Sequence, residues 1–179
     1  MTGVSDFSRL SGVPQAYIAK MVEDVPQGDR GALELFLALR SAARRVEHAV
    51  ATWLDRSELT STKLDVLHLL RSGDGMSVTQ MSEFLRMTQP NVTFVVNALE
   101  RDGSVVRATS PTDRRSTIVR LSEAGERLIA GVTPLHMRAI TRALENVSAR
   151  DRKRFVATLA AVAEGFERIE LDTLDTADG

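Results

Sequence analysis

The stretch that decides the fold is residues 76–125, which read MSVTQMSEFLRMTQPNVTFVVNALERDGSVVRATSPTDRRSTIVRLSEAG. Ser77, with Gln80 three positions later, forms a capping-box pattern that predicts the start of one short helix. Thr88 is the expected cap of a second helix. The buried stripe of that second helix, spaced i, i+3, i+4 and i+7, comprises Val92, Val95, Val96 and Leu99. Two short helices joined by a brief turn predict a helix-turn-helix unit.

Two short β-like runs, residues 105–108 and 117–121, follow this unit. The residues between them have turn chemistry, so we expect a β-hairpin with a basic loop. Helix, turn, helix and hairpin in this order indicate a winged helix-turn-helix. The expected fold class is therefore mainly α with a small β-hairpin wing.

Amphipathic helices are expected on both sides of this unit. A helix over about residues 30–53 carries a heptad-spaced seam, and a last helix capped by Ser148 carries a second stripe. Such stripes need a partner helix, in the same chain or in another. The two sets are Phe36, Leu39, Ala43, Val46, Val50 and Trp53, and Phe155, Leu159, Val162, Phe166 and Ile169. A helix capped by Ser122 is expected to bury Ala124, Leu128, Val132, Leu135 and Ala139.

Composition narrows the class of protein. The chain has 179 residues, 43% of them hydrophobic, and no cysteine, which excludes a disulfide scaffold and a thiolate nucleophile. There is no apolar run of about 18 residues and no secretory signal, so we expect a cytoplasmic protein without a membrane partner. The net charge is -1, but residues 86–120 carry six arginines against three acids. Residues 164–179 carry six acids against one arginine, so the charge is segregated along the chain.

The second helix of the unit has an outward face suited to reading DNA. If its valine and leucine stripe points inward, Phe94 is exposed at the middle of a polar face, where it could meet a thymine methyl group. The alternative is that Phe94 packs under the wing or against a neighbouring helix. Amides on the same face can pair with adenine. The candidate DNA-binding residues of this region are Thr88, Gln89, Pro90, Asn91, Thr93, Phe94, Asn97 and Arg101.

The hairpin loop is a second candidate contact. Arg114 and Arg115 lie at its tip, and a narrow minor groove attracts such side chains. Asp113 could orient one guanidinium through a charge-assisted hydrogen bond. The alternative is a solvated turn with a local ion pair.

These stretches, together with LTSTKLDVLHLL at residues 59–70, resemble the MarR family of transcriptional regulators. Asp113 and Arg115, followed by Leu-Ser-x-x-Gly ending at Gly125, form the most family-specific part. The resemblance covers about residues 30–170 and implies a homodimer on double-stranded DNA. It also implies a repressor, released from a palindromic operator by a small, often aromatic or anionic, ligand.

Three positions depart from the family pattern. Phe94 stands where the family often has a basic or small polar residue, so the base preference does not carry over. Ser104 replaces an apolar residue after the helix-ending glycine, and Arg86 occupies a turn position where many helix-turn-helix units have glycine.

The resemblance implies that the first and last helices form the dimer. The expected dimer contacts are Phe36, Leu39, Ala43, Val46, Val50, Phe155, Leu159, Val162 and Phe166. The expected organisation is an arm with a short helix at 1–28, a dimerisation helix at 29–57, the DNA-binding domain at 58–121, C-terminal dimerisation helices at 122–172 and an acidic tail at 173–179.

No catalytic or metal-binding constellation is evident. His48, His68 and His136 fall on three different predicted helices, and none has a carboxylate at HExxH spacing. We therefore expect no enzyme, no metal and no cofactor. Arg44, with His48 and His68, is a candidate anion site for an effector, although a solvated face is the alternative. Rival hypotheses are a winged-helix protein-interaction module and a ligand-insensitive or architectural DNA binder.

Overall fold

The computed structural model describes residues 20, 23, 25–57, 59–71, 73–110 and 115–169. The helices and strands are α3 (Arg30–Leu54), a short 3₁₀ turn (Asp55–Ser57), α4 (Ser61–Leu70), α5 (Val78–Leu85), α6 (Gln89–Arg101), β1 (Val105–Thr109), β2 (Thr117–Leu121), α7 (Glu123–Ala143) and α8 (Ala149–Glu167). The chain divides into two compact units, one up to Val132 and one from Thr133. None of the helices in the described ranges combines the length and apolarity needed to cross a bilayer.

Local capping starts the helices where the sequence predicts. Ser77 Oγ accepts from Gln80 N at 3.2 Å, and Gln80 Oε1 accepts from Ser77 N at 2.9 Å, which completes the capping box of α5. Ser148 caps α8 by accepting from Asp151 N at 3.1 Å. Thr88 occupies the predicted N-cap position of α6, but its side chain makes no capping hydrogen bond. The predicted start of the helix is therefore confirmed, and the predicted cap is not. Pro90 in the first turn leaves fewer amide donors there to satisfy.

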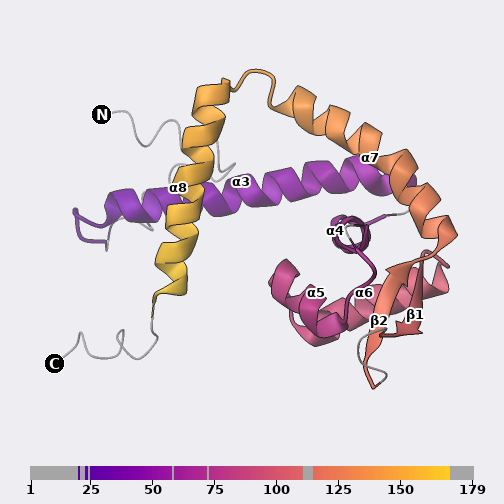
Figure 1. Ribbon diagram of the computed structural model, residues 1–179. Coiled ribbons are helices and arrows are strands. Elements are labelled where there is room, and N and C mark those ends of the chain that lie inside the picture. The colour runs from indigo at the N-terminus through magenta and orange to yellow at the C-terminus, as the bar shows by residue number, and fades with distance from the viewer. Residues whose placement is uncertain are drawn as a thin grey trace. The chain divides into compact units, whose positions relative to one another are not determined.

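One hydrophobic core holds the helix-turn-helix and the wing together. Figure 1 shows α4, α5 and α6 gathered around one another, with the β1–β2 hairpin beside α6. Four helices and both strands contribute fully buried side chains. They are Leu64, Val66, Leu67, Met81, Val92, Val96, Leu99, Val105, Val119 and Ile129. Burial of this kind contributes about 1.5–3 kcal/mol for each large side chain, so the core fixes the orientation of α6.

The turn between α5 and α6 contains a strained residue. Arg86 has φ 52° and ψ 41°, the left-handed conformation that glycine adopts without penalty. For a residue with a Cβ this conformation costs about 1–2 kcal/mol. Arg86 therefore adopts the conformation that glycine would have in this turn, at some cost in the stability of the fold.

The wing is a five-pair antiparallel ladder, running from Val105 opposite Leu121 to Thr109 opposite Thr117. Met76 adds an isolated bridge on the other side of β2: its amide donates to Val119 O at 3.0 Å and its carbonyl accepts from Val119 N at 2.8 Å. The hairpin is thereby tied to the segment that leads into α5, so the wing has a fixed base next to α6.

Helix α7 buries only part of the predicted face. Val132 is buried and Leu128 packs against the core, as predicted, whereas Ala124 and Leu135 are exposed. Gly125 and Ile129 are buried beside them and were not predicted. At the first turn the α7 backbone passes so close to the Ser104 carbonyl that a Cβ on Gly125 would overlap it, which turns this side of the helix inward.

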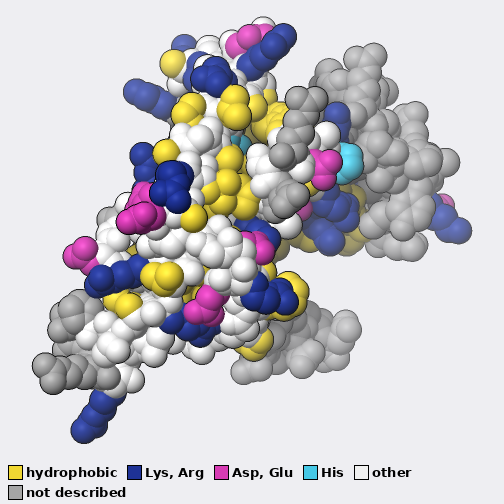
Figure 2. Space-filling view, turned by 90° about the vertical axis from the view of Figure 1, so that its right-hand side faces the viewer, with side chains coloured by type: hydrophobic (Ala, Val, Ile, Leu, Met, Phe, Trp, Pro, Cys, Tyr) yellow, Lys and Arg dark blue, Asp and Glu magenta, His cyan; other side chains and the backbone are white. Residues whose placement is uncertain are grey.

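Helices α3 and α8 leave apolar side chains uncovered. In α8 no residue is buried, and Phe155 and Phe166 are 62% and 51% exposed. In α3, Val46 is 62% exposed, whereas Val50 packs against the core of its own chain. Figure 2 shows hydrophobic side chains reaching the surface in groups, with Lys and Arg side chains around them.

Candidate DNA-binding interface

Helix α6 presents opposite faces to the core and to solvent. Its apolar stripe is buried, and Phe94 on the other side is 72% exposed. This excludes the alternative that Phe94 packs under the wing or against a helix of the described chain. The other candidate residues are also exposed except Thr93, which is half-buried: Thr88, Gln89, Pro90, Asn91, Asn97 and Arg101.

An ionic cluster joins α6 to the wing. Arg107 on β1 donates from Nε to Glu100 Oε2 at 3.0 Å and from Nη2 to Asn97 Oδ1 at 2.6 Å. The sequence interpretation gave Arg107 no role beyond the basic charge of its region. The position of Arg107 in the strand that directly follows α6 could have suggested a contact with that helix. No pattern in the neighbouring sequence, however, predicts which way the strand directs this side chain.

A second ion pair anchors the end of α6. Lys63 Nζ lies 2.6 Å from Asp102 Oδ2, and so links the first turn of α4 to the C-cap of α6. Both side chains are partly exposed, so the pair contributes little stability. It connects the C-terminal end of α6 to α4.

The wing loop is described only in part. Arg115 is described and exposed, and Ser110 N donates to Ser116 O at 2.8 Å, closing the loop at its base. Asp113 and Arg114 lie outside the described residues. The wing thus brings at least one basic side chain to the loop of a hairpin that packs against α6.

Two of the predicted ligand residues lie together. Arg44 and His48 line a hollow of about 470 Å³, along with Ser41 and Arg45, all on α3. His68 lies on α4 and is not among the described residues that line it. Arg45 is a cationic neighbour that was not among the predicted ligand residues.

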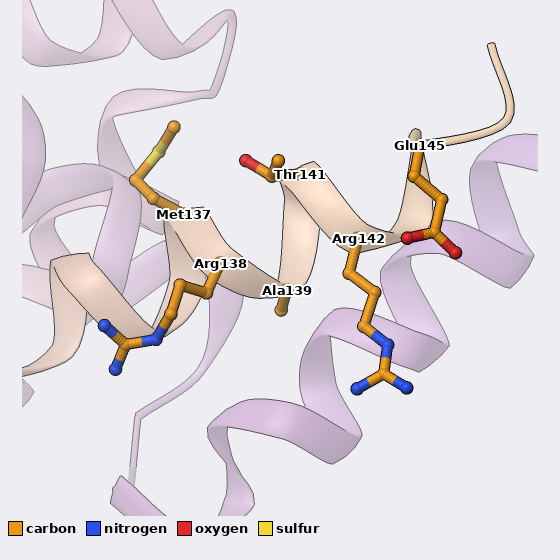
Figure 3. A pocket seen from close by; sticks show the side chains of 6 residues that line it. All are labelled: Met137, Arg138, Ala139, Thr141, Arg142 and Glu145. Carbon is orange, nitrogen blue, oxygen red and sulfur yellow. The ribbon is translucent and has the colours of Figure 1, made fainter.

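A second hollow, of about 740 Å³, lies along the C-terminal half of α7 and was not predicted. Figure 3 shows Arg138 and Arg142 pointing to the same side of the helix, and Met137 and Thr141 to another. The described lining residues come from α7, except Glu145, which lies in the turn that follows it. In the described residues no group of three or more His, Cys, Asp or Glu side chains could hold a metal ion.

Comparison with known proteins identifies the class. Residues 59–117 match the model described as MarR family. The HTH-type transcriptional repressor YetL of Bacillus subtilis is 27% identical over 157 residues, 87% of this chain and 92% of YetL. The HTH-type transcriptional regulator YdgJ of the same organism is 30% identical over 112 residues, 63% of this chain and 68% of YdgJ.

Solved structures agree with these relatives. The transcriptional repressor CouR bound to a 23-mer DNA duplex has a TM-score of 0.67 and 30% identity, covering 78% of this chain and 99% of that one. CouR from Rhodococcus jostii RHA1 bound to p-coumaroyl-CoA has the same fold, with a TM-score of 0.67, 24% identity and coverage of 72% and 91%. This chain therefore belongs to the MarR family and is a DNA-binding transcriptional regulator of the MarR type rather than an enzyme.

Proposed function

We propose that the protein is a homodimeric repressor that reads a palindromic operator with α6 in the major groove and the wing in the minor groove. The observation that carries this proposal is the outward face of α6. Phe94 is 72% exposed at the middle of the face opposite Val92, Val96 and Leu99, which are fully buried, so its ring is presented to a partner outside the chain. An apolar contact with thymine methyl groups supplies such a partner.

The proposed contacts divide by type. Gln89, Asn91, Thr93, Phe94 and Asn97 read base edges in the major groove. Thr88, Pro90 and Arg101 lie at the two ends of α6, where they meet the phosphate backbone. Arg114 and Arg115 enter the minor groove, and Asp113 orients one of them.

The uncovered faces of α3 and α8 support a second copy of the chain as the partner. Phe155, Phe166 and Val46 are each at least half exposed, which is unusual for large apolar side chains of a stable monomer. In a two-fold dimer the recognition helices would lie about 34–36 Å apart, one turn of DNA. Residues 29–57 and 122–172 then serve as dimerisation regions, and residues 58–121 bind DNA. DNA binding of this kind takes place in the cytoplasm.

The hollow on α3 supports release by an anionic ligand. Arg44, Arg45 and His48 together offer charge-assisted donors to a carboxylate or a phosphate group. The related CouR binds p-coumaroyl-CoA, whose coenzyme A part carries phosphate groups. A ligand that prefers a dimer with a different helix spacing lowers DNA affinity by its differential affinity for the two states. His68, away from this hollow, has no part in the proposed site.

Fluorescence anisotropy of the full chain tests DNA binding. A labelled duplex from upstream of its own gene is compared with a shuffled duplex across a salt series. We expect nanomolar binding to the first and a steep fall in affinity as salt rises. Equal weak binding to both, with no enrichment in a random-sequence selection, would instead favour the interaction module or an architectural binder.

Release is tested on the same complex with p-coumaroyl-CoA as the probe. Free coenzyme A and free p-coumarate separate the contribution of the phosphates from that of the aromatic acyl group. We expect the thioester to release DNA from the wild-type protein, and Arg44→Ala to need more of it. A wild-type complex that all three compounds leave intact contradicts the proposed class of ligand.

A further inference from the structure

Asn97 is held by the wing through one particular atom. Arg107 donates from Nη2 to Asn97 Oδ1 at 2.6 Å. A guanidinium group has donors only, so the amide can face it only with its oxygen. The hydrogen bond therefore fixes which way round the Asn97 amide lies, a choice that is open for a solvated asparagine.

The guanidinium is itself held on two sides. Its Nε donates to Glu100 Oε2 at 3.0 Å, and Asn97 and Glu100 are three positions apart on α6, so a single planar fork reaches both. Arg107 belongs to β1 and pairs with Val119 across the hairpin, so its backbone is fixed by the wing ladder. The amide orientation is thus set by a rigid element other than the helix that carries Asn97.

This orientation changes what Asn97 can read. The bidentate pairing of asparagine with adenine needs Nδ2 as donor to N7 and Oδ1 as acceptor from the N6 amino group. Oδ1 already accepts a charge-assisted hydrogen bond from Arg107, which weakens this oxygen as the acceptor of a second one, whereas the polarised Nδ2 keeps its full donor capacity for a base edge. An amide that acts mainly as a donor suits guanine, which presents the two acceptors O6 and N7, or thymine, which presents O4. Asn97 is therefore expected to favour these bases over adenine, with which an unrestrained asparagine pairs bidentately.

We propose that Arg107 is a positioning residue that sets sequence specificity by fixing Asn97 as a hydrogen-bond donor, directed to guanine or thymine acceptors and away from adenine. Arg107 also neutralises the Glu100 carboxylate, which would otherwise repel DNA phosphates. The inference rests on the proposed function, because it needs α6 in the major groove.

The test is a selection from a randomised duplex library with wild-type protein, Arg107→Ala, Asn97→Ala and the double variant. We expect Arg107→Ala to release the amide and to raise the frequency of adenine at one base pair of each half-site by about fivefold or more. Asn97→Ala should lose the preference at that base pair, and the double variant should match Asn97→Ala. A uniform loss of affinity for all sequences, with the base profile unchanged, would overturn the inference, because it would report only the uncovered Glu100 charge.

Two controls separate specificity from structure. Lys63→Ala breaks the other ion pair on α6 without touching Asn97, so its base profile should equal that of the wild type. Arg107→Met keeps the apolar stem if Arg107→Ala does not fold, as judged by thermal melting. An unchanged base profile in folded Arg107 variants overturns the inference, and so does a shift that survives in the Asn97→Ala background. A wild-type protein with no sequence preference overturns the proposed function itself.

Discussion

Gly125 lies where the first turn of α7 passes against the backbone of the wing. Ser122 Oγ donates to Gly103 O at 2.6 Å and accepts from Gly125 N at 3.0 Å, so one hydroxyl joins the end of α6 to the start of α7. Ser122 N donates to Ser104 O at 3.1 Å. A Cβ built on Gly125 would overlap that same Ser104 carbonyl oxygen. Ser104 is buried in this junction. A small polar residue is suited to this position, because the contacts around it are made by the backbone.

Gly125→Ala is expected to destabilise the fold by about 2–3 kcal/mol, as overpacking of a closed contact does. The Ser104 carbonyl is backbone and cannot move aside without disturbing the wing. Chemical denaturation of the variant and the wild type measures the difference.

Gly131→Ala is the matched control, because it lies on the same helix and an added Cβ there would meet nothing within 4 Å. Alanine at this position should stabilise the helix by about 0.5–1 kcal/mol. Equal effects of the two substitutions would argue against the close approach at Gly125.

Phe94→Ala is expected to reduce the preference for thymine at one base pair of each half-site by about 1–3 kcal/mol. The side chain is 72% exposed, so the fold itself should keep its stability. Competition binding with single-base operator variants gives the preference. Phe84, 67% exposed on α5, is the matched control, and its replacement by alanine should leave the base profile as it is. An identical base profile for Phe94→Ala and the wild type would show that Phe94 does not contact a base in the major groove.

In the proposed complex, the wing is the element that carries positive charge to the DNA. Its ladder and the Met76 bridge fix the base of the hairpin, whereas the residues around Arg115 form the connection between the strands. A long basic side chain on a fixed base reaches a phosphate or a minor groove at little cost in ordering the backbone. In this proposal, the charge of the loop serves DNA binding, and the apolar packing at the base of the hairpin serves the stability of the wing.

Arg115→Ala is expected to weaken binding to all duplexes alike and to reduce the salt slope by about 1 for each wing. The cause is the loss of one cation that displaces counterions from DNA. Anisotropy titrations at several salt concentrations supply the slope. Arg127→Ala removes an exposed arginine on α7 that faces Glu123 at 3.7 Å, and should leave the slope unchanged. An unaltered slope for Arg115→Ala would exclude the wing loop from the contact.

At the scale of the whole molecule, the proposed homodimer depends on the apolar faces of α3 and α8. Val50 packs against the core of its own chain, so a charge there would unfold the protein and reveal nothing about a dimer. Val46 and Phe155 are each 62% exposed, which makes them the informative positions.

Val46→Asp and Phe155→Asp, singly and together, are expected to yield folded monomers that fail to bind operator. A charge buried in an interface without a partner is strongly unfavourable, whereas at an exposed position it costs the monomer little. Analytical ultracentrifugation measures the state of assembly, and fluorescence anisotropy measures operator binding. Ala157→Asp, at an exposed position of α8 outside the stripe, should leave a dimer. A dimer that persists in the double variant would place the interface elsewhere.

The sequence by itself determined the features that depend on neighbours three or four residues apart. The Ser77 and Gln80 capping box, the buried stripe of α6 and the exposure of Phe94 all follow from helical spacing and short-range hydrogen bonds. The order of helices and strands followed in the same way, and that order carries the resemblance to the family.

Only the tertiary structure decided the features in which elements distant in the sequence meet. The close approach of Gly125 to the Ser104 carbonyl turns one side of α7 inward, and so Gly125 and Ile129 are buried in addition to the predicted Val132. The Arg107 fork reaches Asn97 because β1 packs against α6. Spacing along a chain fixes which residues share a face, but the packing of one element on another fixes what that face meets.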